Sequence, residues 1–365
     1  MRVLLGTQLA EGPVVKQFEK EFAHRFHLKD PVALNSGTSA LELAYELAGI
    51  GPGDEVIVPV LTCTATNLPL VRRGAKLVFA DIDPMTLNMS MRDVAFKMTE
   101  KTKAIVFVDF GGNGQGSAEM ALYAKNRGIK FIEDAAQSVG GSRWAWGHGD
   151  YICISLQAIK TLTAGDGGFL VCKDPADTKR ARMLRWFGYD REEKQRLGDT
   201  DLTFPGYKYH MNDISAAIGL GNLRALGSVL RKRSKVRRWY EEEYKRTQLR
   251  NPHYFDAPFA RLLLYPWLAI LVHPKARSVD ALLSSHGIGS GPYHYRNDKY
   301  SVFGATKKFI DDQCSCTENV GRPDVPQMDA AEYGYTLLPF HHGLSRKDVR
   351  RIVELVARAL YRPGV

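Results

Sequence analysis

The sequence of 365 residues predicts an α/β protein, in which a large, mostly parallel sheet forms one domain and a smaller α+β domain follows it. Two observations support this fold class. Short apolar runs alternate with helical stretches through the first half of the chain, as in a parallel sheet covered by helices. From residue 213 the pattern becomes long and helical, and then mixes prolines, aromatic residues and short apolar runs. We therefore expect a large domain over residues 1–245 and a small C-terminal domain over residues 246–365.

The predicted strands of the large domain are short and almost continuously apolar, which is typical of strands buried on both faces. They are Glu55–Pro59, Lys76–Ala80, Lys103–Val108, Lys130–Glu133, Tyr151–Ser155 and Gly168–Cys172. Between them lie helix candidates such as Ser39–Ala48 and Ala118–Asn126, and a glycine follows closely after each of these.

The second half of the chain begins with one long helical stretch, Asp213–Arg246. Ser345 is a good N-cap for a strongly periodic terminal helix. The segment Asn297–Pro326 has no clear periodicity, which indicates a long surface or active-site loop. The remaining predicted elements are two strands and two helices, at Leu262–Leu264, Leu268–Val272, Ser278–His286 and Arg346–Leu360.

The composition is that of a globular protein, with 44% hydrophobic and 25% charged residues. We find no apolar stretch of membrane-spanning length and no secretory signal, and the five cysteines are too sparse and odd in number to indicate a disulfide framework. We therefore expect a cytoplasmic protein. The net charge of +10 fits either an anionic ligand or a solvated basic surface. The basic run Arg231–Arg238 leads into acidic residues as in an exposed, ion-paired helix, and we expect no nucleic-acid partner.

Three pieces of the chain carry candidate chemistry. Residues Gly37, Thr38 and Ser39 open a helix, where hydroxyl groups and free backbone amides bind phosphate well. Asp134 ends an apolar strand, and acids at the carboxyl ends of parallel strands point into ligand-binding crevices. Lys160 lies in a loop that is followed by glycines. Alone, each has an ordinary alternative: a turn and helix cap, a second helix cap, and a solvated surface lysine.

Together, these pieces match the needs of a pyridoxal phosphate (PLP) enzyme. The amine of a lysine forms the Schiff base with PLP, and a carboxylate keeps the pyridine nitrogen protonated so that the ring accepts electrons. The order of the three pieces, a phosphate turn, then Asp134, then Lys160, makes coincidence improbable. The sequence therefore predicts a PLP-dependent aminotransferase.

Motifs along almost the whole chain resemble the DegT/DnrJ/EryC1/StrS family of sugar aminotransferases. These motifs are Gly12–Glu19, Ser36–Ala40, Gly53–Pro59, Gly74–Asp83, Glu133–Gln137, Ser155–Gly168, Arg185–Gly188, Gly206–Met211 and Leu338–His341. The resemblance implies the aspartate-aminotransferase (type I) fold. It also implies a homodimer whose active sites are built from both subunits, with residues 206–211 reaching into the site of the partner.

The resemblance also assigns roles to individual residues. Lys160 is expected to form the Schiff base and to shuttle the proton, while Asp134 pairs with the pyridine nitrogen. Gln137 is expected at the hydroxyl side of the ring. The phosphate is expected to contact Gly37, Thr38, Ser39 and Ser155.

Three positions depart from the family pattern. Cys63 replaces an aromatic residue that usually stacks on the cofactor ring, and a thiol stacks less well. Asp109 stands where histidine is common. His210 stands where asparagine or arginine usually reaches the partner's cofactor phosphate, and a neutral imidazole donates through only one nitrogen.

The reaction that the resemblance implies moves an amino group from L-glutamate to a nucleotide-linked keto-sugar, most often a 4-keto-6-deoxyhexose. Lys208, Tyr293, His294 and Arg296 are candidate substrate contacts, and packing beneath a loop is an equal alternative for Tyr293. Alternatives are a sugar dehydratase, an amino-acid aminotransferase, or a non-catalytic PLP-binding or nucleic-acid-binding regulator. Cys314 and Cys316 are too closely spaced, and lack a second pair, for a structural zinc site. His341 and His342 could bind a metal, but we expect them to cap or pack before the terminal helix, and the proposed chemistry needs no metal.

Overall fold

The computed structural model describes residues 6, 9–141, 147–198, 201–250, 260–292, 294–304 and 324–361. Its centre is a seven-stranded sheet with the order β1-β7-β6-β5-β4-β2-β3. The five strands from β3 to β6 pair in parallel, whereas β7 is antiparallel to both β6 and β1. The strands are β1 (Val32–Leu34), β2 (Glu55–Pro59), β3 (Lys76–Ala80), β4 (Thr102–Val108), β5 (Lys130–Asp134), β6 (Tyr151–Ser155) and β7 (Gly168–Cys172).

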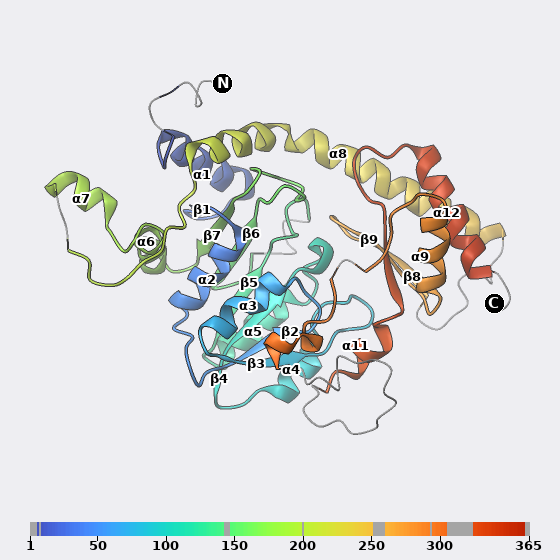
Figure 1. The fold of residues 1–365 in the computed structure, drawn as a ribbon, viewed down its shortest axis with the longest axis horizontal. Coiled ribbons are helices and arrows are strands. Elements are labelled where there is room, and N and C mark those ends of the chain that lie inside the picture. The colour runs from blue at the N-terminus through green and yellow to red at the C-terminus, as the bar shows by residue number, and fades with distance from the viewer. Residues whose placement is uncertain are drawn as a thin grey trace.

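Helices cover both faces of this sheet, as the apolar strands require (Figure 1). Alternate residues point to opposite faces, so Val106 belongs to the core cluster that includes residues of α2, α3 and α6, while Phe107 belongs to the cluster that includes residues of α4 and α5. The helices α1 and α8 cover the β6–β7 side of the second face. The helices of the large unit are α1 (Pro13–Phe26), α2 (Gly37–Leu47), α3 (Thr64–Arg72), α4 (Met91–Lys97), α5 (Ser117–Asn126), α6 (Pro175–Leu184) and α7 (Arg191–Leu197), with a 3₁₀ turn η1 (Phe110–Gly112).

A second sheet of three antiparallel strands forms the core of the C-terminal part. It packs against α9 and α12 through an apolar cluster that also takes Val236 and Tyr240 from α8. Ser345 accepts a hydrogen bond from the amide of Asp348, which confirms it as the N-cap of α12. The elements are β8 (Arg261–Leu264), β9 (Ala269–Val272), α9 (Ala276–Ser285), η3 (Asn297–Lys299), η4 (Ser301–Phe303), α11 (Pro326–Ala331), β10 (Tyr335–Leu338) and α12 (Arg346–Tyr361).

The 38-residue helix α8 (Asp213–Arg250) joins the two parts. Figure 1 shows it running from α1 at one end of the molecule to α12 at the other. The helix is continuous across residue 245, so the domain boundary predicted there lies inside an element that serves both cores, and it stays a prediction. The α/β fold class is confirmed. Within the described residues, we find no helix with the length and hydropathy needed to cross a membrane.

Candidate active site

The candidate site lies at the edge where the parallel strands β4, β5 and β6 end. Asp134 is the last residue of β5, and Ser155 is the last residue of β6. Gly37 opens α2 directly beside them, because a Cβ atom placed on Gly37 would lie only 2.8 Å from the Cβ of Ser155. The close approach explains why glycine occupies this position, and it brings the helix N-terminus next to the strand ends.

The amine of Lys160 is in a sheltered position above this edge. Its Nζ lies 4.2 Å from the centre of the Trp267 ring, which comes from the turn between β8 and β9. Burial lowers the pKa of Lys160, and the nearby Asp134 and Cys63 oppose this effect only in part. The fraction of neutral amine at neutral pH is therefore larger than for a solvated lysine, which is what a nucleophilic and proton-transferring lysine needs.

The carboxyl group of Asp134 is almost fully buried and is held on both oxygens. Oδ2 accepts a hydrogen bond of 2.8 Å from Thr66, and Oδ1 accepts one of 3.1 Å from the amide of Ala136. Burial raises the pKa of Asp134, while these two donors and Lys160 oppose the rise. The site thus contains a buried acid whose charged form depends on its hydrogen-bond donors.

The predicted phosphate contacts gather at the start of α2. Ser36 is the N-cap, and its hydroxyl accepts a 3.0 Å hydrogen bond from the amide of Ser39. The hydroxyl of Ser39 donates to Asn35 at 2.6 Å, so it is already engaged within the chain. Gly37, Thr38 and Ser155 surround the helix N-terminus, where the helix dipole favours an anion.

Gln137 and His294 are two further side chains of the site, and they lie next to each other. The amide oxygen of Gln137 accepts a 2.7 Å hydrogen bond from the amide of Gly111, and its nitrogen lies 3.5 Å from Nε2 of His294. Burial, reinforced by the charge of Lys160, lowers the pKa of His294 to about 3. His294 is therefore an uncharged hydrogen-bonding group beside the lysine.

The segment that contains Lys208 and His210 lies beside β1 in this chain. The amide of Asn35 donates to the carbonyl of Tyr209 at 2.7 Å, and the His210 ring packs against Trp186. Burial lowers the pKa of His210 to about 4, and Nδ1 is buried without a hydrogen-bond partner among the described residues. A contact of His210 with a partner subunit's cofactor stays a prediction. Tyr293 lies outside the described residues.

Arg296 has a different environment from the one predicted for a substrate contact. Its side chain is 1% exposed and lies 2.5 Å from Asp298 and 3.3 Å from Glu332, with a third ion pair to Asp329. These carboxylates of the same chain engage the guanidinium donors. Arg296 therefore ties α11 to the loop after His294, and its role as a substrate contact stays a prediction.

Replacing Arg296 by methionine should destabilise the protein strongly. The change leaves the buried carboxylate of Asp298 without its cation, which costs about 3–5 kcal/mol in comparable sites. Urea denaturation monitored by circular dichroism measures this loss. The matched control is Arg237→Met, which removes an exposed ion pair with Glu241 and should cost less than about 1 kcal/mol. Equal stability of the two variants would contradict the assignment.

Asp109, at the end of β4, is a second buried acid near the site. Its side chain is completely buried, Oδ2 accepts a 2.5 Å hydrogen bond from Ser138, and Oδ1 has no partner among the described residues. Burial and the nearby Glu133 raise the pKa of Asp109 well above its usual range. Both effects favour the neutral form of the Asp109 carboxyl group, which stands where the family commonly has a histidine.

Asp109→Asn should raise stability more at pH 8 than at pH 5. Because the pKa of Asp109 is raised in the folded protein, the folded state holds this proton to a higher pH than the unfolded chain, which releases it above a pKa of about 3.9, so the acid makes folding less favourable as the pH rises. The penalty approaches about 1.4 kcal/mol per pH unit in that window. Melting temperatures of the variant and of the exposed control Glu100→Gln at both pH values measure it. A gain that does not grow with pH would show that Asp109 is ionised.

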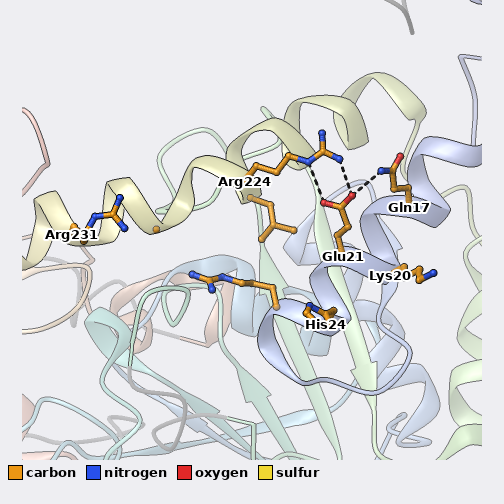
Figure 2. Close-up of a pocket in the computed structure, with 9 residues that line it drawn as sticks. Gln17, Lys20, Glu21, His24, Arg224 and Arg231 are labelled. Carbon is orange, nitrogen blue, oxygen red and sulfur yellow. Dashed lines mark hydrogen bonds and ion pairs between the residues drawn. The ribbon is translucent and has the colours of Figure 1, made fainter.

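A basic groove between α1 and α8 is separate from this site (Figure 2). It has a volume of about 740 Å³ and is lined by residues that include Lys20, Arg25 and Arg231. Figure 2 shows Arg224 and Gln17 pointing toward the carboxylate of Glu21, each with a hydrogen bond of 2.8 Å. The residues that line the groove do not include Lys160, Asp134 or any other residue of the candidate site described above.

A sheltered lysine, a strand-end acid and a helix N-terminus on a type I α/β scaffold define a PLP-dependent aminotransferase. The chain belongs to the DegT/DnrJ/EryC1/StrS aminotransferase family, whose profile matches residues 1–357.

Curated relatives and solved structures agree with this assignment. The chain is 37% identical over 245 residues to the spore coat polysaccharide biosynthesis protein SpsC of Bacillus subtilis (strain 168), a match that spans 65% of this chain and 63% of that protein. It is 30% identical over 369 residues, with 96% and 95% of the two chains covered, to the dTDP-4-dehydro-2,3,6-trideoxy-D-glucose 4-aminotransferase of Saccharopolyspora spinosa. The crystal structure of the aminotransferase TlmJ from Streptoalloteichus hindustanus superposes with a TM-score of 0.83 at 28% identity, over 98% of this chain and 93% of that one.

Proposed function

We propose that this aminotransferase moves an amino group from L-glutamate to the keto group of a nucleotide-linked sugar, most often a 4-keto-6-deoxyhexose in such enzymes, and that it acts as a homodimer. The observation that carries the proposal is the sheltered amine of Lys160 beside the buried carboxylate of Asp134. The relative from Saccharopolyspora spinosa is named as a 4-aminotransferase of a dTDP-linked 4-dehydro sugar, and this supports the substrate class.

The residues present fit PLP. Lys160 would hold the cofactor aldehyde, and Asp134 would accept a hydrogen bond from the protonated ring nitrogen. The helix N-terminus at Gly37, with Thr38 and Ser155, would hold the phosphate, since only a glycine leaves the space between α2 and β6. When bound, PLP supplies an electron sink that stabilises negative charge at the carbon that loses its proton.

The protein's own groups provide binding, shelter and proton transfer. Lys160, with its lowered pKa, can take a proton at Nζ from the donor carbon in the first half of the reaction and deliver a proton from Nζ to the acceptor carbon in the second half. Trp267 and the half-buried His294 lie around this nitrogen and limit the access of water. Gln137, fixed by Gly111, would hold the hydroxyl side of the cofactor ring.

His294 and Lys208 differ in charge, so they suit different parts of the substrate. Burial keeps His294 neutral, so it offers hydrogen bonds to a sugar hydroxyl and no charge to a diphosphate. Lys208 is exposed beside the start of α2, and it provides the cation that a nucleotide diphosphate needs. Tyr293 remains a candidate contact by its neighbouring position in the sequence.

A product assay tests this function. Purified protein loaded with PLP is incubated with L-glutamate and a panel of nucleotide-linked keto-sugars, and products are identified by mass spectrometry and NMR. We expect an aminated sugar together with 2-oxoglutarate. Loss of water from the sugar without gain of nitrogen would identify a dehydratase, and transfer only to 2-oxo acids would identify an amino-acid aminotransferase.

A further inference from the structure

Two threonine hydroxyls form a chain behind Asp134, on helix α3 and the turn before it. Thr62 Oγ1 lies 2.9 Å from Thr66 Oγ1, and Thr66 Oγ1 lies 2.8 Å from Asp134 Oδ2. Thr62 is 2% exposed and Thr66 is completely buried. Hydrogen bonds therefore link Thr62 to Thr66 and Thr66 to the acid. These bonds lie in a dry environment, where they are electrostatically stronger than in water.

The direction of the hydrogen bonds follows from the number of protons. Each hydroxyl has one proton to donate. An ionised Asp134 can only accept, so the proton of Thr66 points to Oδ2. Thr62 must then donate to Thr66, because the proton of Thr66 is already used. Both dipoles point toward the carboxylate, and this arrangement favours its charged form.

Other contacts hold the backbone of Thr66 and that of Thr62 in place. The Tyr45 hydroxyl donates to the backbone carbonyl of Thr66 at 2.8 Å. The Asn297 side chain donates to the backbone carbonyl of Thr62 at 2.7 Å, and the Asn67 side chain donates to Asn297 at 3.0 Å. Tyr45 is on α2 and Asn297 is on η3, so elements distant in sequence fix the two threonines before any cofactor binds.

We propose that Thr62 and Thr66 form a positioning relay, which keeps the Asp134 carboxylate ionised and oriented so that its remaining lone pairs are available to the protonated ring nitrogen of PLP. This inference rests on the proposed use of PLP and adds two residues to its site. Burial raises the pKa of Asp134 and the bond from Thr66 opposes the rise, in agreement with the relay.

Removal of the Thr66 hydroxyl tests the relay. In Thr66→Val the shape is kept and the donor is lost, whereas Thr66→Ser keeps the donor. We expect Thr66→Val to weaken PLP binding about tenfold, as for the loss of a hydrogen bond to a charged group, and Thr66→Ser to remain within about threefold of the unmodified protein. Dissociation constants come from titrating the apo-protein with PLP and following visible absorbance.

The pH dependence of binding separates a relay from simple packing. Without its donor, Asp134 takes up a proton at a higher pH, so PLP binding should fail earlier as the pH is lowered. The ratio of dissociation constants between Thr66→Val and the unmodified protein should therefore be larger at pH 6 than at pH 8. Other described titratable groups that face Asp134 stay unchanged in these variants, namely Lys160, Tyr45, Cys153 and Asp109.

Thr178→Val is the matched control, because Thr178 is a buried threonine of α6 whose hydroxyl bonds to a backbone carbonyl far from Asp134. Its PLP affinity should equal that of the unmodified protein. Thr62→Val should weaken binding less than Thr66→Val, and it provides the test if Thr66→Val does not fold. Unchanged affinity in both valine variants, or equal losses in Thr66→Ser and Thr66→Val, overturns the relay. Absence of PLP binding by the unmodified protein instead overturns the proposed function.

Discussion

Lys160→Ala is expected to abolish transamination. The variant loses the only nitrogen that the described site places at a sheltered position facing both Asp134 and Trp267. Covalent attachment of the cofactor and proton transfer at Nζ disappear together, so we expect turnover to fall by more than about a thousandfold. The amount of aminated sugar formed per enzyme, measured by mass spectrometry, gives the loss.

The matched control for this variant is Lys173→Ala, which removes an exposed lysine just after β7 and should keep full activity. Borohydride reduction of the PLP-loaded protein followed by peptide mapping gives an independent measurement. It should label the peptide that contains Lys160 and leave that of Lys173 unlabelled. Label at another lysine, or retained turnover in Lys160→Ala, refutes the role of Lys160.

Much of the fold was predictable because it depends on local pattern. The strands of the large sheet are buried on both faces, so their sequences are continuously apolar and easily recognised. The long helix was predicted from Asp213, where α8 begins, to Arg246, four residues before its end at Arg250. The domain boundary was harder to place, because a single helix contributes to both cores and carries no breaking residue near 245.

The candidate site was predictable only in part, because motifs report local chemistry and not the partners that folding brings together. Lys160 and Asp134 lie in distinctive motifs, and the structure places them together. Trp267 lies in a mixed apolar segment of the C-terminal part, and nothing in that segment indicates that its ring contacts the lysine. Thr66 lies three residues after Cys63, and the sequence alone indicated no role for it.

The partners of Arg296 in the folded chain could not be predicted from the local sequence. An arginine beside tyrosine and histidine in a loop is typical of a substrate contact, yet three acids from positions 298, 329 and 332 surround it. Two of these acids are on or next to α11, distant in sequence, so only the folded chain reveals the pairing. Two other contacts hold the loop that carries His294 at the site: the Tyr335 hydroxyl donates to the carbonyl of His294, and the Asn297 side chain donates to the carbonyl of Thr62.

Asp134→Asn is expected to lower turnover about a hundredfold or more, which is typical when a charged group that stabilises the reacting centre is removed. The amide keeps the size of the side chain but carries no charge, so it cannot hold the proton on the pyridine nitrogen. The control Asp150→Asn removes a carboxylate at the start of β6, at the opposite edge of the sheet, and should retain activity.

The double variant Asp134→Asn with Thr66→Val tests whether Thr66 acts by stabilising the charge of Asp134 or only by packing against it. If Thr66 acts by stabilising the ionised carboxylate, its removal should have no further pH-dependent effect once the carboxylate is an amide. Dissociation constants for PLP at pH 6 and pH 8 for both single variants and the double variant give this coupling. Additive losses of PLP affinity at both pH values would mean that Thr66 acts by packing alone. For the single variant, turnover in Asp134→Asn within threefold of the unmodified protein would remove Asp134 from the mechanism.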